Sequence, residues 1–433
     1  MDPLTIALIG VLAMFVLILL HVPLGVSMAL VGVVGFAQIV DWGPALTLMA
    51  SEPAAAMSNL EIAVIPLFML MGSLATVGGL GTDIYAVAYA LIGHRRGGLA
   101  TTTIVASAGF GSVCGSGVAT TATFSRVALP EMLGRGYAPS LASGSVAAGG
   151  TLGIIVPPSS MMILYAVLTE QSVLQLFSAA IIPAAMAVAF YIIAIQIKVR
   201  LDPETGPKGE RLPIKDRMRA LGQGWGVALL ATVVLGGIYS GIFTVHEAAA
   251  IGVVIAFLFA LLRRRLGAKE FLDVLGEASS STAMIYIMIF GATIFSYFIS
   301  VTGGADAIVG AIGSLDVPPL VIIGLILLLY IFLGAFFDEV AAMVITLPFV
   351  IPVIQDLGYD LVWWGVINVV VIGMGMLTPP IGINVMVLHG MNPNLGLRTI
   401  YSGIWPFFFA DVFRLALLTL FPVLTLWLPS VLQ

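Results

Sequence analysis

Two stretches of an otherwise apolar chain each contain a glycine four residues before a pair of prolines. They read "GTLGIIVPPSS" at residues 150–160 and "GMGMLTPPIGIN" at residues 373–384, and the two glycines are Gly153 and Gly375. Proline removes a backbone N–H and blocks the carbonyl group of the preceding turn, and the residue before it leaves helical geometry. Each stretch therefore predicts a helix that breaks and then resumes.

A helix broken inside a membrane has a chemical consequence. Its freed carbonyl and N–H groups are costly in hydrocarbon and are tolerated only where protein, water or a ligand satisfies them. The carbonyl oxygens suit a hard cation, and the N-terminus of the second half-helix suits an anion. A simple proline kink is the structural alternative, but the motif occurs twice and each copy follows a polar segment. We therefore expect two ion-binding breaks.

Hydroxyl and carboxyl groups lie in the segments that precede the two breaks. The first segment reads "GFGSVCGSGVATTATFSR", and the second, "LGAFFDEVAAM", contains Asp338 and Glu339. An ionisable residue at membrane depth is a functional candidate by default. Each group also has a structural alternative: the small residues could let helices pack closely, and Asp338 could cap a helix. Glu339 could face the open end of the hairpin or cap a helix. The hydroxyl residues are Ser112, Ser116, Thr120, Thr121 and Thr123.

Several further polar residues have a structural and a functional interpretation. Arg126 could attract a carboxylate, although an interface anchor is the default for such a residue. Asn384 follows the second proline pair and could complete a set of oxygen ligands. Arg414 has Asp411 one turn before it, which indicates a structural ion pair. The four histidines and the single cysteine, Cys114, show no spacing typical of a transition-metal site.

The composition indicates the class of protein that must position these residues. Of the 433 residues, 60% are hydrophobic and only 9% are charged, whereas a soluble domain has about 25% charged residues. The first apolar run has no basic region before it and no small-residue cleavage site, so it predicts a transmembrane helix rather than a signal peptide. We therefore expect an all-α polytopic membrane protein.

Runs of about 20 apolar residues divide the chain into four parts. Spans are expected at 4–20, 24–40, 62–78, 172–197, 221–240, 246–262 and 281–300, with a last one after 397. N-terminal scaffold helices are expected at 1–61, and a loop with a linking helical hairpin at 198–280. The first repeat, at 62–197, has an amphipathic arm at 83–93, a hairpin at 98–133 and a broken helix at 138–168. The second repeat, at 281–433, has an arm at 305–315, a hairpin at 317–355 and a broken helix at 359–390.

Basic residues predict the orientation of these parts. The loop at 198–219 is rich in Lys and Arg, and cytoplasmic loops are enriched in these residues. Counting spans from this loop places the other basic clusters on the same side and the N-terminus in the periplasm. The count is consistent only if 98–133 and 317–355 each enter and leave the membrane on one side. The two hairpins are therefore expected to be re-entrant.

Six landmarks recur at an offset of 222 residues and indicate an internal repeat. Because the two hairpins open on opposite sides in this orientation, the repeats are expected to be inverted. Inverted repeats with helices broken at mid-membrane are the architecture of secondary transporters. The landmarks are Pro130 and Pro352, Gly136 and Gly358, Tyr137 and Tyr359, Gly153 and Gly375, Pro157 and Pro379, and Pro158 and Pro380.

With these motifs placed, the chain resembles the large membrane subunit of the tripartite ATP-independent periplasmic (TRAP) transporters. The resemblance covers essentially the whole chain and is carried by "HVPLGVSMAL", "GTLGIIVPPS" and "GMLTPPIGIN". It implies a Na+-coupled elevator transporter of the bacterial inner membrane that imports a small organic acid and is not an enzyme. It also implies a separate small four-helix membrane subunit and a periplasmic solute-binding protein as partners. The sequence contains no nucleotide-binding motif such as a P-loop and gives no sign of nucleic-acid binding.

The resemblance also implies Na+ sites where each hairpin tip meets its broken helix. The predicted Na+-binding residues are Ser112, Gly115, Ser116, Gly153 and Val156 in the first repeat, and Gly334, Asp338, Gly375, Thr378 and Asn384 in the second. The candidate substrate-binding residues are Ser116, Thr120, Arg126, Ser159 and Asn384.

Three other interpretations are weighed against this one. A stand-alone Na+-coupled anion transporter or exchanger of the same superfamily would share the architecture and need no binding protein. An intramembrane hydrolase with Ser116 as nucleophile would need a basic residue near the hairpin tip, and neither hairpin tip has a histidine or lysine. A passive channel fits poorly because two breaks of opposite sense favour alternating access.

Overall fold

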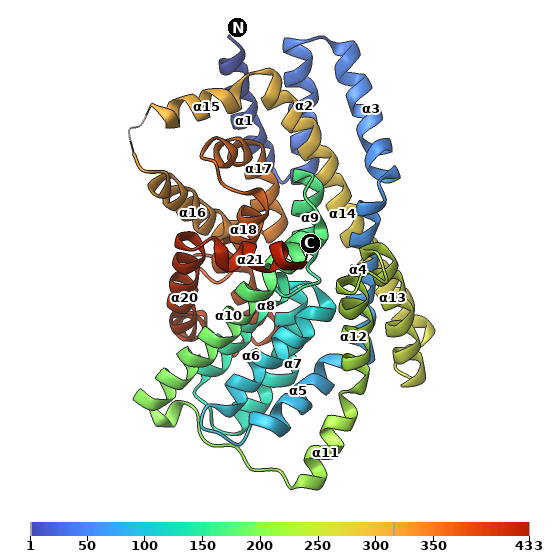
Figure 1. Ribbon diagram of the computed structural model, residues 1–433, viewed down its shortest axis with the longest axis vertical. Helices are drawn as coiled ribbons and strands as arrows, with labels where there is room; N and C mark the ends of the chain where they lie inside the picture. The colour runs from blue at the N-terminus through green and yellow to red at the C-terminus, as the bar shows by residue number, and fades with distance from the viewer. Residues whose placement is uncertain (1, 315–316, 433) are drawn as a thin grey trace.

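The computed structural model describes residues 2–314 and 317–432, and within these residues every regular element is a helix (Figure 1). Seven helices of the described part are long and apolar enough to cross a membrane, or up to nine if each bent pair is one span. The predicted all-α polytopic class is therefore confirmed. The last residue of the predicted arm at 305–315 and the final residue of the predicted second repeat lie outside the described residues.

One group of helices, called the scaffold below, forms one side of the molecule. The long helix α14 packs along α2 and α4, and α13 packs along α4. The backbones of α2 and α14 touch, because a Cβ added to Gly291 would lie 2.1 Å from the carbonyl oxygen of Gly25. The scaffold helices are α1 (Pro3–Leu19), α2 (Leu24–Ile39), α3 (Trp42–Ser58), α4 (Leu60–Gly78), α12 (Trp225–Tyr239), α13 (Val245–Leu262) and α14 (Ala268–Val301).

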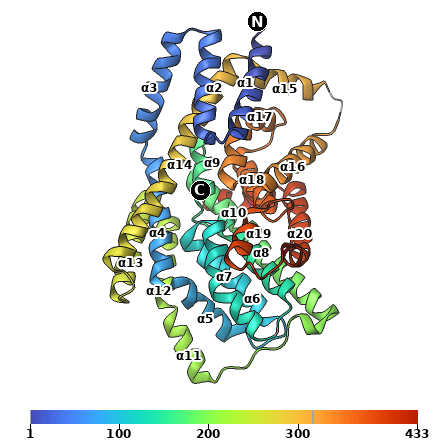
Figure 2. The same ribbon diagram turned by 180° about the vertical axis from the view of Figure 1, so that it is seen from behind.

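A second group, called the body below, contains both hairpins and both broken helices. Figures 1 and 2 show α16, α18 and α20 on the opposite side of the molecule from α3, α4, α13 and α14. Within the body, α8 packs against α6, α7 and α20, and α18 packs against α16. The body helices are α6 (Gly98–Cys114), α7 (Gly117–Gly134), α8 (Pro139–Ile155), α9 (Ser160–Thr169), α10 (Val173–Leu201), α16 (Pro319–Phe336), α17 (Glu339–Asp356), α18 (Leu361–Gly375), α19 (Ile383–Met391), α20 (Leu397–Leu420) and α21 (Val423–Leu432).

Two short amphipathic helices connect the scaffold to the body. Helix α5 (Leu80–Ile92) contacts α4 as well as α6 and α7, and α15 (Gly304–Gly313) contacts α1 and α14 as well as α17. They occupy the ranges that were predicted as arms. The connection after α10 contains a short 3-10 helix, η1 (Pro203–Thr205), and the basic helix α11 (Ile214–Gln223), which packs on α5.

The two hairpins end in the same backbone conformation. Gly136 after α7 and Gly358 after α17 have φ of +78° and +75°. The next residue in each case, Tyr137 or Tyr359, donates its N–H to a carbonyl five residues earlier, at 3.0 and 3.1 Å. This is a helix C-cap that needs a positive φ, which glycine adopts without strain. The Gly-Tyr landmarks in the sequence therefore mark equivalent helix ends.

The structure differs from the sequence-based boundaries in four places. The span expected at 281–300 begins earlier, because α14 starts at Ala268 and contains no proline. The span expected at 221–240 is α12, which begins at Trp225, and α11 precedes it with a bend of 44° between the two helices. Helix α3 was not predicted, because proline and polar residues dilute its apolar pattern. The final run is divided into α20 and α21. By length and composition α16 and α17 could each cross a membrane, so the re-entrant hairpins stay a prediction.

Candidate functional site

The tip of the first hairpin is held against the first broken helix. The chain turns at Gly115, whose φ is +64°, and Ser116 then caps α7 by accepting the N–H of Ala119 at 3.4 Å. Across the break, the Ser160 hydroxyl donates to the carbonyl oxygen of Gly115 at 2.7 Å. The second half-helix, α9, is therefore fixed to the hairpin tip.

Two glycines allow the backbones of hairpin and broken helix to touch. A Cβ added to Gly111 of α6 would lie 2.9 Å from the Cα of Gly153 in α8. A Cβ added to Gly153 would lie 2.5 Å from both the carbonyl oxygen of Ser116 and the hydroxyl oxygen of Thr120. No side chain fits at either position, so the α6–α7 turn lies directly on α8 just before its break at 156–159.

The second hairpin repeats this contact on the second broken helix. A Cβ added to Gly334 of α16 would lie 2.9 Å from the Cα of Gly375 in α18, and one added to Gly375 would lie 2.6 Å from the Cα of Gly334. Across the break at 376–382, Ile381 and Gly382 donate their N–H groups to the Ala335 carbonyl at 3.3 and 3.2 Å. In both breaks the Pro–Pro peptide bond is cis. The pairs Gly111–Gly153 and Gly334–Gly375 thus hold equivalent places.

Most of the predicted Na+-binding residues gather at these two contacts. Ser116 and Val156 lie at the ends of the first hairpin turn and the first half-helix, and Val156 donates its N–H to the Leu152 carbonyl. In the second repeat, Asp338 caps α17 by accepting the N–H of Ala341 at 2.8 Å. The hydroxyls of Ser112 and Thr378 donate to helix carbonyls at 2.8 Å, those of Gly109 and Met374.

The backbone of Asn384 lies at the second break, where its N–H donates to the carbonyl of Met376 at 3.3 Å, but its side chain reaches the first repeat. It was assigned to the Gly334–Gly375 site, but its side-chain amide donates to the carbonyl of Ala147 in α8 at 3.3 Å. A Cβ added to Gly150 of α8 would also lie 2.8 Å from the Asn384 Nδ2 atom. Asn384 is fully buried, and its Oδ1 atom has no hydrogen-bond partner in the described residues. It therefore joins the second broken helix to the first.

An open cleft of about 580 Å³ lies between the scaffold and both hairpin tips. Ser116 and Arg126 line it from the first hairpin, and Asp338 and Glu339 line it from the second. The scaffold side is formed by α4 and α14, including Glu277. Two of the predicted substrate-binding residues, Ser116 and Arg126, therefore line the same cleft.

Three other predicted substrate-binding residues do not line this cleft. Thr120 is buried and donates its hydroxyl to the Ser116 carbonyl at 2.7 Å. Ser159 is buried, donates to the carbonyl of Ile154 and caps α9. Asn384 is on α19, and its side-chain amide bonds to α8, as described above. The hydroxyls of Thr120 and Ser159 are used to hold the hairpin and the half-helix, and the neighbouring Ser160 lines the cleft instead.

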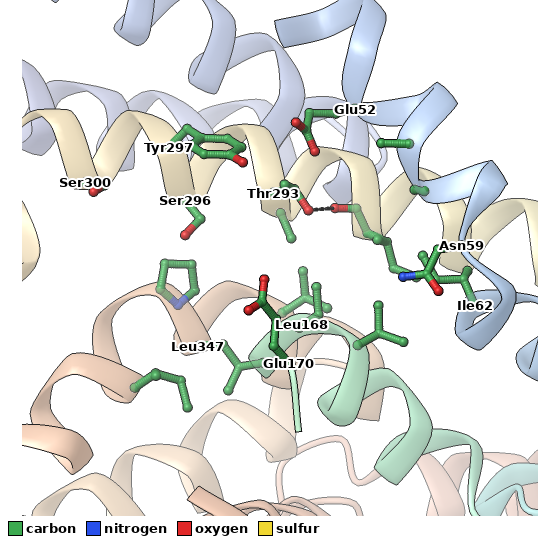
Figure 3. Close-up of a pocket in the computed structure, with 18 of the residues that line it drawn as sticks. Glu52, Asn59, Ile62, Leu168, Glu170, Thr293, Ser296, Tyr297, Ser300 and Leu347 are labelled. Carbon is green, nitrogen blue, oxygen red and sulfur yellow. Dashed lines mark hydrogen bonds between the residues drawn. The ribbon is translucent and has the colours of Figure 1, made fainter. Parts of the chain in front are cut away.

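A second cavity of about 580 Å³ also lies between scaffold and body (Figure 3). Helices α3, α4 and α14 form one wall, and the end of α9 and the middle of α17 form the other. Figure 3 shows Glu52 and Glu170 facing each other across it. Its lining includes neither Ser116 nor Asp338. The hairpin-tip residues Ser116 and Asp338 therefore line the first cleft and not this cavity.

Two acidic residues of the body are deeply buried. Glu339 is 9% exposed, and its Oε2 atom, which has no hydrogen-bond partner in the described residues, lies 3.3 Å from the position of a Cβ on Gly117. Asp411 pairs with Arg414 at 2.8 Å, as the spacing indicated. The Tyr191 hydroxyl donates to Asp411 at 2.5 Å and lies 3.0 Å from that of Thr151 in α8. Sequence reasoning missed Gly111, Tyr191 and Thr151 as site or support residues.

Comparison with known proteins identifies the family. The profile described as "Tripartite ATP-independent periplasmic transporter, DctM component" matches residues 11–424. The chain belongs to this family. It is 31% identical to the C4-dicarboxylate TRAP transporter large permease protein DctM of Pseudomonas aeruginosa, with 84% of this chain and 85% of that protein covered. It is 30% identical to the sialic acid TRAP transporter large permease protein SiaM of Vibrio cholerae, over 88% of this chain and 89% of that protein.

A solved structure is similar in fold. The YdaH transporter of Alcanivorax borkumensis, described as having an unusual topology, superposes with a TM-score of 0.58 at 15% sequence identity and covers 87% of this chain and 88% of its own. The predicted resemblance to the TRAP large membrane subunit is confirmed by the family and its relatives. The relatives are transport permeases, which confirms that the chain is a membrane transport protein and not an enzyme.

Proposed function

We propose that this TRAP permease imports a small organic acid together with Na+, working with a separate small membrane subunit and a periplasmic binding protein that delivers the acid. The observation that carries the proposal is the duplicated glycine contact, Gly111 with Gly153 and Gly334 with Gly375. Each contact brings a hairpin tip onto a broken helix, where backbone carbonyls lie close to side-chain oxygens. Hard cations such as Na+ are bound by sets of oxygen ligands.

The residues at both contacts provide oxygen ligands, which suit a hard cation such as Na+ better than a transition metal that prefers nitrogen or sulfur ligands. The first contact offers the backbone of Gly115 and Val156 and the Ser116 hydroxyl, and the second offers the Asp338 carboxylate and the Thr378 hydroxyl. The unpartnered Oδ1 atom of Asn384 is a further oxygen. Within residues 2–314 and 317–432 no group of three His, Cys, Asp or Glu residues could hold a metal ion. Bound Na+ would supply positive charge beside an anionic substrate.

An elevator movement is the second part of the proposal. The cleft and the second cavity lie between the same scaffold helices and the same body, at different heights along α14. Sliding of the body along α14 would open the hairpin tips to one space and then to the other. The arm α5 is tied to the scaffold by an ion pair of 2.6 Å between Asp83 and Arg263. Burial raises the pKa of Asp83, and the nearby Arg263 and Arg265 act against this shift.

The orientation is proposed from charge. In Figure 1 the basic helix α11 lies at one end of the molecule and the N-terminus at the other. The basic residues at 263–265 follow α13, beside the end of α4 that also lines the cleft. The preference of Lys and Arg for cytoplasmic loops then puts the loop 198–219 in the cytoplasm and the N-terminus in the periplasm. In this orientation the cleft opens toward the cytoplasm.

The tripartite proposal is tested by transport of labelled organic acids into proteoliposomes that contain this chain and its small subunit. Uptake is measured with and without the binding protein encoded beside them. Uptake that needs the binding protein supports the proposal. Uptake that proceeds equally without it contradicts the tripartite proposal and favours a stand-alone transporter with the same architecture.

A further inference from the structure

We propose that the acid carried by this permease also bears a positively charged nitrogen, which the Glu339 carboxylate recognises. The inference rests on the proposed transport function and concerns the same cleft between the hairpin tips. It adds a substrate class: a carboxylic acid with an ammonium or quaternary ammonium group, such as an amino acid or a betaine. A simple dicarboxylate has no such group.

The first observation is a buried carboxylate without a partner. Glu339 is the first residue of α17, directly after the tip of the second hairpin, and only 9% of its surface is exposed. Its Oε2 atom has no hydrogen-bond donor in the described residues and points to Gly117 at the start of α7. Burial without a partner disfavours the charged form of a carboxyl group, and a cationic group beside it stabilises that form. A positively charged group of a ligand in the cleft could therefore supply the partner that Glu339 lacks.

The second observation is the charge of the cleft itself. Among the described residues that line it, Arg126 is the single basic residue, and Glu277, Asp338 and Glu339 are the three acidic residues. No ion pair found in the described residues includes any of these four. The proposed Na+ ions offset this negative charge without leaving a surplus of positive charge for a second carboxylate, whereas an ammonium group would pair with an acidic side chain.

The four charged groups do not have equal roles. Asp338 already accepts the N–H of Ala341 and lies at the predicted Na+ site. Glu277 is on the scaffold helix α14 and is exposed, so water screens its charge. Arg126 is exposed on α7 and can bind the carboxylate of a substrate. Glu339 is the buried acid of the set, and it is the group that discriminates between substrates with and without a positive charge.

Recognition of a charged group by a buried acid gives strong selectivity. A charge-assisted hydrogen bond contributes about 1.5–3 kcal/mol, which corresponds to about tenfold to hundredfold in affinity. Loss of the negative charge in the Glu339→Gln variant, which keeps the size of the side chain, is therefore expected to raise the KM for a zwitterionic acid by about tenfold or more. The half-saturating Na+ concentration is expected to stay unchanged.

The test has two steps and uses the complete transporter. Ligands of the co-encoded binding protein are first sought by thermal shift with a panel of succinate, N-acetylneuraminate, L-glutamate, glycine betaine and γ-aminobutyrate. Uptake of the ligand found is then measured in proteoliposomes with the wild-type chain, with Glu339→Gln and with Asp356→Asn. Asp356 is the exposed last residue of the same helix, so Asp356→Asn is the matched control.

A zwitterionic ligand, together with a KM effect confined to Glu339→Gln, supports the inference. A ligand without a cationic group, carried in a Na+-dependent way by the wild type, overturns it and leaves the proposed function intact. A Glu339→Gln variant whose half-saturating Na+ concentration rises while its KM is unchanged also overturns it, because Glu339 would then bind the ion. The proposed function fails separately, if the wild-type complex shows no Na+-dependent uptake of any acid in the panel. The binding-protein panel needs no variant and is unaffected by a folding defect.

Discussion

Gly111 of α6 and Gly153 of α8 are so close that a Cβ on the first would lie 2.9 Å from the Cα of the second. Gly334 and Gly375 repeat the relationship in the second half of the chain, with the same distance of 2.9 Å. Small residues let transmembrane helices approach at backbone distance. Here they bring two hairpin tips onto the two broken helices, and the proposed ion sites depend on that approach.

A methyl group at Gly153 tests the first contact. The Cβ of Gly153→Ala would lie 2.5 Å from the backbone oxygen of Ser116, so the hairpin tip must shift. We expect a loss of about 1–3 kcal/mol in stability, the usual cost of overpacking, seen as a lower melting temperature, together with a large loss of uptake. Gly276→Ala in α14 is the control, since a Cβ there meets nothing within 4 Å. Full uptake by Gly153→Ala would show that the contact is not required.

The same change at Gly375 tests the equivalence of the two halves. Its Cβ would lie 2.6 Å from the Cα of Gly334, so we expect Gly375→Ala to lower the melting temperature and the uptake to a similar extent as Gly153→Ala. Both quantities are measured for the two variants in parallel. If one of the two variants is as active as the wild type and the other variant is inactive, the two contacts have different roles.

Asp338 can be tested as an ion ligand without losing its role as a helix cap. Asparagine caps helices as well as aspartate does, so Asp338→Asn keeps the bond from Ala341 but removes the charge. We expect the half-saturating Na+ concentration for uptake to rise by about tenfold, the effect of losing one charge-assisted contact. Asp360→Asn is the control, because Asp360 caps α18 by accepting N–H groups of Val362 and Trp363. Equal Na+ dependence in Asp338→Asn and wild type would remove Asp338 from the ion site.

The buried network behind α8 is expected to support stability. The Tyr191 hydroxyl lies between Asp411 and Thr151, and all three side chains are buried. Tyr191→Phe leaves Asp411 without this donor, and we expect a loss of about 1–3 kcal/mol. The melting temperature of the purified complex measures it. Tyr286→Phe is the control, because the hydroxyl of Tyr286 makes no hydrogen bond in the described part of the chain. An unchanged melting temperature in Tyr191→Phe would contradict a supporting role.

The sequence predicted the ranges of the helix pairs α6–α7 and α16–α17 and the two breaks closely, because local residues determine them. Proline pairs end α8 and α18, and positive-φ glycines such as Gly115 and Gly136 mark turns. What the sequence could not predict depends on contacts between distant segments. Gly111 has no local feature that distinguishes it from its neighbouring glycines until α8 lies on it. Asn384 follows the second break in sequence, yet its side chain bonds to α8 of the first repeat, 237 residues away.

Boundaries were less accurate where apolar patterns are diluted or continuous. Helix α3 contains Pro44, Glu52 and Pro53, which hide its helical pattern in the sequence. Helix α14 begins with a polar stretch before Ser281, so a search for apolar runs places the start of the helix too late in the sequence. Both errors concern the scaffold and leave the residues of the hairpin tips unaffected.

The central claim is that an inward Na+ gradient drives this permease, and ion replacement tests it most directly. Uptake of the acid found for the binding protein is measured in proteoliposomes with external Na+ replaced by K+ at constant ionic strength and pH, with a proton ionophore present. The account predicts that uptake stops in K+ and returns with Na+, with a half-saturating Na+ concentration that rises in Asp338→Asn. Uptake that continues unchanged in K+ would contradict it.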